Sequence, residues 1–384
     1  MKEGWEYKKL GEVCTIERGG SPRPISDYIT DSENGINWIK IGDAVEGSKY
    51  IMSTAEKIKP EGMKKSRFVH KGDFILSNSM SFGKPYILGV DGCIHDGWLV
   101  IHDDNNTFNK DFLYYYLGSS TIYSEFKRLA VGGVVNNLNS NLVRGVKIAI
   151  PPLTEQQQIV EELDLLSSII EKKKAQLNEL DNLAQSLFYE MFGDPITNEK
   201  GWKIKKLGDI SNYSKTRIKA EEVSIKNYVG VDNLLQKCEG KTDAAKVPEA
   251  INHIEYIKDD VLIGNIRPYL KKIWLAKYRG GCNGDVLVIR RLPLYQNTVN
   301  PIYLFKCLSD DAFFAYDMQF SKGEKMPRGD KKEILKYPIA IPPIHLQNQF
   351  ASKIEAIEHQ KELIRQSIKE VETLFNSRMD YYFN

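Results

Sequence analysis

The chain contains 384 residues, of which 42% are hydrophobic and 27% charged, and its formal net charge is +2. This composition is typical of a folded protein with two or three domains and excludes a largely disordered chain. No apolar run approaches the ~20 residues that a membrane-spanning helix needs, and the first residues lack the apolar stretch of a secretory signal. Five cysteines without a Cys-x-x-Cys spacing argue against a disulfide framework or a zinc ribbon. We therefore expect a protein of the reducing cytoplasm that does not associate with membranes.

The sequence consists of two similar halves. The segment GWEYKKLGEV at residues 4–13 returns as GWKIKKLGDI at residues 201–210, and Ile-Ala-Ile-Pro-Pro at residues 148–152 returns at residues 339–343. Between these anchors the two halves match weakly. Internal repetition of this kind indicates a duplicated architecture. We expect each half to contain a globular part that ends at the Pro-Pro pair and is followed by a polar helix.

Two long helices with a narrow apolar seam are predicted after the Pro-Pro pairs. Apolar residues recur there at alternating spacings of four and three, the period of a left-handed coiled coil. The predicted seam positions are Ile159, Leu163, Leu166, Ile170, Leu177, Leu180 and Leu187 in the first helix and Phe350, Ile354, Ile357, Ile364, Ile368, Val371 and Phe375 in the second. Lys173 and Lys361 interrupt the two seams at different layers, so we expect the helices to pair with each other. A pseudo-two-fold axis between the halves would make this pair antiparallel.

The predicted helices also conceal a basic bias elsewhere in the chain. Eight acids and only three lysines lie between residues 154 and 192, where Gly193-Asp194-Pro195 is expected to end the first helix. The globular parts are therefore more basic than the net charge suggests, which is compatible with phosphate contacts.

The sequence lacks the motifs of common catalytic sites. It has no Gly-x-x-x-x-Gly-Lys-Ser/Thr loop, no Gly-x-Gly-x-x-Gly after a strand and no His-Glu-x-x-His pair. The Pro-Pro pairs lack the preceding Asp or Asn and the following aromatic residue of an amino-methyltransferase motif. His95-Asp96 has the form of a base with an orienting acid, but no nucleophile is marked beside it. The sequence therefore predicts a binding protein without a catalytic site, a cofactor or a metal, although a dispersed carboxylate–lysine nuclease site stays open as an alternative.

Side chains that contact phosphates or read base edges gather in three loops of each half. Arg23, Arg267 and Arg328 are candidates for guanine, because a guanidinium group matches its O6 and N7 atoms. Asn78, Asn137 and Asn265 suit adenine in the same bidentate way. Each of these residues has a turn-forming alternative, because Gly, Asn and Ser are common in turns. The full set of candidate DNA-contacting residues is Arg18, Ser21, Arg23, Ser77, Asn78, Ser79, Lys84, Asn136, Asn137, Asn139, Lys215, Arg217, Asn265, Arg267, Tyr269, Lys322, Lys325 and Arg328.

One segment resembles the signature of a known family. Residues 151–160, Pro-Pro-Leu-Thr-Glu-Gln-Gln-Gln-Ile-Val, resemble the PPL-x-EQ-x-x-Ile motif of the specificity subunits of type I restriction–modification systems. The second copy departs from the motif, because His345-Leu346 replaces Thr-Glu and leaves Glu155 without an acidic counterpart. The doubled layout extends the resemblance over essentially the whole chain.

The resemblance implies an α+β fold with two repeated mixed α/β target recognition domains, at residues 1–152 and 195–343. Two spacer helices, at residues 153–194 and 344–384, would separate them and pack as an antiparallel coiled coil. Each domain would read one half of a bipartite, asymmetric site, and the helices would set the gap between the halves.

The resemblance also implies the partners of the chain. These are double-stranded DNA, two modification subunits that carry S-adenosylmethionine and methylate adenine, and restriction subunits driven by ATP. The chain itself would then be a non-catalytic, cytoplasmic DNA-binding subunit without cofactors. The alternatives are a coiled-coil adaptor that binds no DNA and a stand-alone DNA endonuclease.

Overall fold

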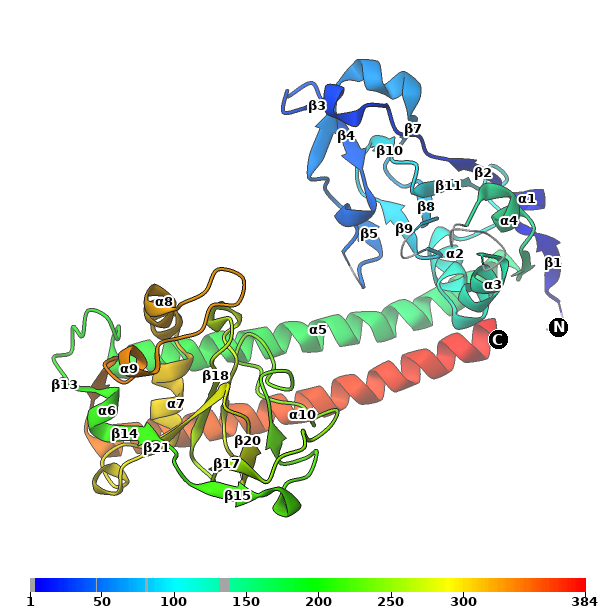
Figure 1. The fold of residues 1–384 in the computed structure, drawn as a ribbon. Helices are drawn as coiled ribbons and strands as arrows, with labels where there is room; N and C mark the ends of the chain where they lie inside the picture. The colour runs from blue at the N-terminus through cyan, green and yellow to red at the C-terminus, as the bar shows by residue number, and fades with distance from the viewer. Residues whose placement is uncertain (1–3, 46, 80–81, 131–137) are drawn as a thin grey trace. The chain divides into compact units, whose positions relative to one another are not determined.

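The computed structural model describes residues 4–45, 47–79, 82–130 and 138–384. The chain forms two compact units, and each combines a globular part with about half of each long helix (Figure 1). Unit 1 comprises residues 1–174 and 366–384, and unit 2 comprises residues 175–365. The two long helices are α5 (Leu153–Phe192) and α10 (Ile344–Phe383).

Unit 1 contains two five-stranded sheets and a two-stranded ribbon. The sheets have the strand orders β2-β11-β8-β9-β5 and β3-β6-β4-β10-β7, and the ribbon pairs β1 with β12. The elements before α5 are β1 (Glu6–Lys9), α1 (Leu10–Val13), β2 (Thr15–Arg18), β3 (Ile29–Thr30), β4 (Ile36–Ile39), β5 (Tyr50–Ile51), β6 (Glu56–Ile58), β7 (Arg67–Val69), β8 (Phe74–Ser77), β9 (Pro85–Leu88), β10 (Gly92–Ile94), β11 (Trp98–His102), α2 (Lys110–Leu117), α3 (Ser120–Ala130), α4 (Ser140–Arg144) and β12 (Lys147–Ile150).

Unit 2 repeats this plan in a smaller form. Its sheets have the orders β14-β21-β18-β19 and β15-β17-β20-β16, and its ribbon pairs β13 with β22. The elements between α5 and α10 are β13 (Lys203–Lys206), α6 (Leu207–Ile210), β14 (Ser211–Tyr213), β15 (Arg217–Lys219), β16 (Tyr228–Val229), β17 (Asn252–Tyr256), β18 (Val261–Gly264), β19 (Ile273–Leu275), β20 (Gly280–Cys282), β21 (Val286–Arg291), α7 (Pro301–Ser309), α8 (Asp311–Phe320), α9 (Lys331–Ile334) and β22 (Pro338–Ile341).

The repeated sequence anchors pair with each other inside each unit. In unit 1 the first anchor forms β1 and the second forms β12, with Tyr7 opposite Ala149. In unit 2 the same two anchors form β13 and β22, with Ile204 opposite Ala340. The best-preserved segments of the repeat thus build the antiparallel ribbon from which each long helix continues. The duplicated α+β fold predicted from the sequence is confirmed.

The long helices pack antiparallel in both units. Each helix has 40 residues, which corresponds to ~60 Å at 1.5 Å per residue. In unit 1, Phe383 at the end of α10 shares a hydrophobic core with Leu163 near the start of α5. In unit 2, Phe188 and Phe192 at the end of α5 lie 5.7 and 5.2 Å, between ring centroids, from Phe350 near the start of α10. These contacts confirm the predicted antiparallel pair.

The seam between the helices is apolar with a few charged positions. Every predicted seam side chain is buried or half-buried. Lys361 is only 6% exposed, and its ammonium group lies 2.6 Å from a carboxylate oxygen of Asp181 on α5. In unit 1, Arg378 of α10 donates to the carboxylate of Glu162 on α5 at 2.8 Å and lowers the pKa of that carboxyl group. A charged pair on an apolar seam disfavours other registers, because a slip would bury an unpaired charge.

A buried glutamine fastens the start of α5 to the globular part of unit 1. The side chain of Gln156 is fully buried. Its Nε2 atom donates to the carbonyl oxygens of Thr107 at 3.0 Å and Pro151 at 2.9 Å. Its Oε1 atom accepts a hydrogen bond from the backbone N–H of Asn109 at 2.8 Å. Because Asn109 is also the N-cap of α2, one side chain connects the segment before α2 to the Pro-Pro turn before α5.

Unit 2 repeats the same junction at the start of α10. The side chain of Gln347 is also fully buried. It donates to the carbonyl oxygens of Thr298 at 3.1 Å and Pro342 at 2.7 Å. It accepts a hydrogen bond from the backbone N–H of Asn300, the N-cap of α7, at 2.9 Å. We call Gln156 and Gln347 with these partners the glutamine junctions.

The departure of the second helix from the family motif changes one contact. In unit 1 the indole N–H of Trp5 donates to the carboxylate of Glu155 at 3.0 Å. Trp202 takes the place of Trp5 in the repeat, but Leu346 cannot accept a hydrogen bond where Glu155 would. The Trp202 indole instead donates to the carbonyl oxygen of Phe192, at the end of α5, at 2.8 Å. The repeated tryptophan thus keeps a partner in each unit.

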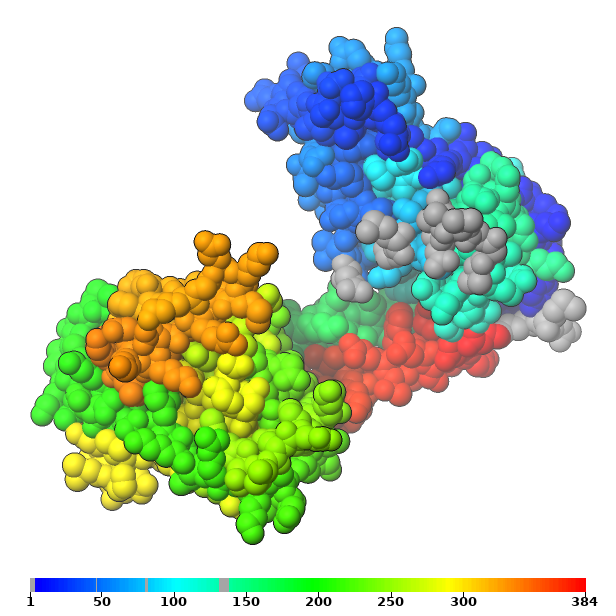
Figure 2. Space-filling view, in the orientation of Figure 1, coloured from blue at the N-terminus to red at the C-terminus, as the bar shows by residue number. Residues whose placement is uncertain are grey.

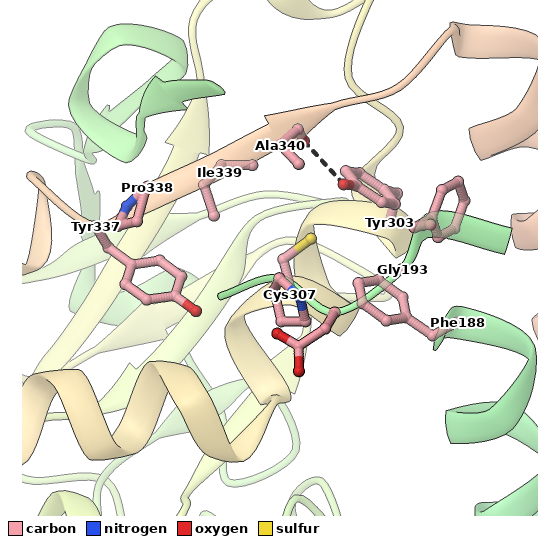
Figure 3. A pocket seen from close by; sticks show the side chains of 11 residues that line it. Phe188, Gly193, Tyr303, Cys307, Tyr337, Pro338, Ile339 and Ala340 are labelled. Atoms are coloured by element: carbon pink, nitrogen blue, oxygen red, sulfur yellow. Dashed lines mark hydrogen bonds between the residues drawn. The ribbon is translucent and has the colours of Figure 1, made fainter. Parts of the chain in front are cut away.

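Helix α5 ends at Phe192, as the Gly-Asp-Pro segment after it predicts. A small cavity lies at this end, against α7 and β22 (Figure 3). Aromatic side chains, including Phe188 and Tyr303, line it, and the Tyr303 hydroxyl donates to the carbonyl oxygen of Ala340 at 2.8 Å. Its volume of about 10 Å³ is about the room that one water molecule needs. This cavity is therefore a packing feature and not a ligand site.

The described residues contain no helix that combines the length and the apolar character needed to cross a membrane. Within the same residues, no group of three or more His, Cys, Asp and Glu side chains has the arrangement of a metal site.

Candidate nucleic-acid interface

A polar cluster surrounds the turn between β10 and β11 in unit 1. The Asp96 carboxylate accepts a hydrogen bond from the Ser21 hydroxyl at 2.8 Å, and a guanidinium nitrogen of Arg23 lies 3.4 Å from it. The carbonyl oxygen of Asp96 accepts from Nε of Arg18 at 2.9 Å and from the side-chain amide of Asn78 at 3.1 Å. Four predicted DNA-contacting residues from two separate loops therefore meet on one turn.

The electrostatics of this turn favour a neutral histidine beside an ionised aspartate. The backbone N–H of Gly97 donates to Nδ1 of His95 at 2.9 Å, which leaves the ring proton on Nε2, 3.0 Å from Asp96. Burial lowers the pKa of His95 more than the nearby Asp96 carboxylate raises it. Burial raises the pKa of Asp96, but the hydrogen bond from Ser21 and the neighbouring positive charges outweigh it and lower that pKa. His95 thus supports the turn in which the cluster is built.

The corresponding turn of unit 2, between β20 and β21, organises a second cluster. The backbone N–H of Asn265 donates to the carbonyl oxygen of Asp285 at 2.8 Å. Nε of Arg328 donates to the Asp285 carboxylate at 3.3 Å. The backbone N–H of Arg267 donates to the carbonyl oxygen of Pro327 at 2.7 Å. The segment after β18 and the loop after α8, both predicted to contact DNA, therefore lie together at this turn.

The two clusters occupy equivalent places in the two units. Asn78 is the first residue after β8 and Asn265 is the first after β18, and both side chains are buried. The side-chain oxygen of each is enclosed and has no hydrogen-bond partner among the described residues. Asp96 and Asp285, around which the clusters form, were not among the predicted DNA-contacting residues, and Asp96 was noted only as an acid that could orient His95. The available signal was the Gly-Cys pair, at residues 92–93 and 281–282, whose cysteine lies three residues before each aspartate.

The remaining predicted residues divide into turn formers and exposed side chains. The Ser77 hydroxyl accepts a hydrogen bond from the backbone N–H of Lys84 at 2.9 Å. The Asn139 side chain caps α4, because it accepts a hydrogen bond from the backbone N–H of Leu142 at 3.0 Å. The side chains of Ser77 and Asn139 therefore make the local backbone contacts that the turn-forming alternative predicts. Asn136 and Asn137 lie outside the described residues. Ser79 is half-buried, and the exposed residues are Lys84, Lys215, Arg217, Tyr269, Lys322 and Lys325.

The repeated units and their equivalent clusters define a duplicated protein with two similar polar surfaces. The family model of the type I restriction modification DNA specificity domain matches residues 2–182 and, a second time, residues 199–373. The chain therefore belongs to the family of type I restriction–modification specificity proteins.

Individual relatives agree with this assignment. The MjaIX specificity subunit of Methanocaldococcus jannaschii is 27% identical over 229 residues, and this match spans 55% of the chain and 52% of the relative. The MjaVIII specificity subunit of the same organism is 19% identical over 403 residues, with 97% of the chain and 90% of the relative covered. The crystal structure of a type I restriction–modification S subunit from M. genitalium has the same fold, with a TM-score of 0.57 at 14% identity over 99% of the chain and 96% of that subunit.

Proposed function

We propose that this chain is the DNA-recognition subunit of a type I restriction–modification complex, and that each unit reads one half of a bipartite site. The observation that carries the proposal is the pair of clusters at equivalent turns, whose arginines come from different segments of the two units. In unit 1, Arg18 and Arg23 lie at and after the end of β2, whereas in unit 2, Arg267 follows β18 and Arg328 follows α8. A repeated frame with exposed arginines at different positions would recognise two unlike half-sites, which makes the whole site asymmetric.

The chemistry of the clusters suits base reading in the major groove. Arg23 is 79% exposed and Arg328 is 52% exposed, so both guanidinium groups can reach a guanine edge. Asp96 and Asp285 hold these groups near the turns without enclosing them. The two carboxylates also disfavour contacts with phosphate, because like charges repel.

The helix pair is proposed to set the gap between the half-sites. Each helix is continuous through 40 residues, and one turn of DNA measures ~34 Å. The proposed partners are duplex DNA, two modification subunits that bind S-adenosylmethionine, and ATP-driven restriction subunits, in the cytoplasm. The catalytic steps are assigned to these partners, because the sequence itself carries no catalytic motif.

The half-sites are expected to respond to separate substitutions. Replacing both Arg18 and Arg23 by alanine should relax or change one half of the methylated motif, and replacing both Arg267 and Arg328 should affect only the other half. The reason is that a lost bidentate contact to a base removes about 1–3 kcal/mol of discrimination at that position. Genome-wide mapping of N6-methyladenine, in cells that carry the chain with its modification subunits, measures the motif.

A matched control removes two exposed positive charges from β1. Replacement of Lys8 and Lys9 by alanine should leave both half-sites unchanged. A change in both half-sites after either arginine pair is replaced would contradict independent reading by the two units.

One exposed leucine recurs at the same position of the two long helices and marks a docking surface for the modification subunits. Leu183 of α5 is 46% exposed in unit 2, and Leu374 of α10 is 49% exposed in unit 1. Both are the thirty-first residue of their helix. An exposed leucine costs solvation free energy that burial by a partner would recover. Two equivalent positions suit two copies of one partner.

Charged substitutions at these positions are expected to change the stoichiometry of the complex. Leu183→Glu and Leu374→Glu should each leave one modification subunit bound, and the double variant none, because a buried unpaired carboxylate opposes docking. Light scattering of the purified complexes gives the masses. Asn178→Glu adds the same charge at another exposed position of α5 and should keep two subunits bound. Two bound subunits in the double variant would refute this surface.

A further inference from the structure

Tyr269 is the exposed tip of a short turn in the unit 2 cluster. The turn is a 3-10 segment, Pro268–Leu270, that follows β18 and Arg267. The Tyr269 side chain is 51% exposed. Its hydroxyl and its ring make no hydrogen bond, ring stack or cation contact with the described part of the chain. About half of this large aromatic side chain is thus presented to solvent.

The backbone holds this turn rigidly on both sides. Arg267 and Lys271, which flank it, have φ angles of 53° and 52°, in the left-handed region that residues other than glycine seldom adopt. The backbone N–H of Lys237 donates to the carbonyl oxygen of Leu270 at 3.0 Å, and Arg267 is tied to Pro327. Strained backbone that surrounding contacts maintain is concentrated at functional sites. The turn therefore holds the backbone of Tyr269 in a preset position.

Exposed basic side chains lie around the turn. Arg267 is exposed. Arg328, which pairs with Asp285, is 52% exposed, and Lys322, which pairs with Asp330, is 83% exposed. The Arg328 and Lys322 backbones pair with each other, and Arg328 also pairs with Ile266, just before the turn. The segment from α8 through this loop lies at the surface of unit 2 (orange in Figure 2). The aromatic ring is suited to contact stacked bases, and the exposed cations are suited to a polyanion. Duplex DNA has both features.

We infer that Tyr269 inserts its ring into the base stack of the half-site that unit 2 reads, and so unstacks one base step. This inference rests on the proposed function and adds a role for one residue. Apolar side chains that enter the base stack partly unstack one base step and kink the duplex. Pyrimidine–purine steps deform most easily. The inserted Tyr269 ring, which we call the wedge, therefore favours sites that contain such a step. This preference adds to the base preferences of Arg267 and Arg328.

In the described part of unit 1, the ring at the corresponding sequence position is packed against a neighbouring ring. Phe82 follows Asn78 by four residues, as Tyr269 follows Asn265. The Phe82 ring is half-buried and stacks on Tyr123 with the ring centroids 6.1 Å apart. A ring packed in this way cannot enter DNA without leaving its own core. The distortion is therefore confined to one half-site.

The test uses the complex with its modification subunits and a duplex that carries the methylated motif. 2-Aminopurine replaces each purine in turn and fluoresces more strongly when it is unstacked. The wild-type complex should raise the fluorescence at one step, within the half-site that responds to substitution of Arg267 and Arg328. Tyr269→Ala should abolish this rise and weaken binding about tenfold. Tyr269→Phe keeps the ring and should retain both effects.

Three results separate the possible failures. Tyr278→Ala removes a ring of unit 2 that is 41% exposed and outside the cluster, and it should leave the fluorescence rise intact. A rise that persists in Tyr269→Ala would overturn the wedge, and so would a loss in Tyr269→Phe as large as in Tyr269→Ala, because the hydroxyl would then carry the contact. Absence of site-specific binding by the wild-type complex would instead overturn the proposed function.

Discussion

Replacing Gln156 by leucine is expected to lower the free energy of unfolding of unit 1 by about 3–6 kcal/mol. Leucine has a similar volume, so the change mainly removes hydrogen bonds. It leaves three buried or part-buried backbone groups without the side-chain partner: two carbonyl oxygens, of Thr107 and Pro151, and the N–H of Asn109. Each unpaired buried polar group costs about 1–3 kcal/mol. Urea unfolding gives the free energy, and hydrogen exchange shows which unit has lost protection.

The repeat supplies a built-in comparison for this prediction. Gln347→Leu should destabilise unit 2 to a similar degree, because its three partners are equivalent. Gln157 is next to Gln156 but is exposed, and Gln157→Ala should cost about 0.5 kcal/mol or less. If Gln156→Leu were no more harmful than Gln157→Ala, the glutamine junctions would not have the structural role assigned to them.

The junctions also matter for recognition. They connect the ribbon, the caps of α2 and α7 and the starts of the long helices, so they join the globular part of each unit to its helix. If the globular part of a unit can change its orientation on the long helix, it loses the preset geometry that base contacts require. We therefore expect the glutamine variants to weaken DNA binding at temperatures where both units are still folded.

The second large effect concerns the stability of unit 2 as a function of pH. Asp317 on α8 is only 1% exposed, and neither carboxylate oxygen has a hydrogen-bond partner among the described residues. An added Cβ on Gly329 would lie 2.2 Å from one of these oxygens, so the loop packs closely on the carboxyl group. Burial raises the pKa of Asp317 from 3.8 to about 6, because the charged form is poorly solvated there.

The direction of the pH effect follows from proton binding. Between about pH 4 and pH 6 the folded state keeps a proton at Asp317 that the unfolded chain has lost. The contribution of Asp317 to stability is therefore most favourable below this window, falls as the pH rises through it, and stays lower above it. Asp317→Asn cannot ionise and should raise the free energy of unfolding at pH 7.5 by up to about 3 kcal/mol, at 1.36 kcal/mol per pKa unit.

Urea unfolding at pH 4 and pH 7.5 measures this difference. The gain from Asp317→Asn should be small at pH 4, where the wild-type carboxyl group is already neutral. Asp311 on the same helix is 78% exposed, and Asp311→Asn should change stability by less than about 1 kcal/mol at either pH. Parallel pH profiles for the wild type and Asp317→Asn would show that Asp317 does not titrate in this window.

Sequence patterns predicted those parts of the structure that depend on residues close together along the chain. The four–three spacing of apolar residues predicts the two helices, and Gly193 marks the end of the first. Repetition itself indicated that the helices belong together. Gln156 and Gln347 recur at the same offset after the Pro-Pro pairs. This recurrence is the sequence signal that marks the glutamine junctions. A side chain that joins distant backbone segments cannot be distinguished from a solvated one by local pattern.

Heptad spacing, helix ends and repeats are local properties, so the duplication, the long helices and the residue types of each loop could be predicted from the amino-acid sequence. The convergence of Arg18, Arg23 and Asn78 on Asp96, and the turn contacts of Ser77 and Asn139, could not, because they depend on the folded chain. Residues more than seventy positions apart, such as Arg18 and Asp96, meet because antiparallel pairing of β2, β8 and β11 brings their ends to one edge. Strand pairing and burial are properties of the whole fold. They determine which of many similar polar side chains come together in a site.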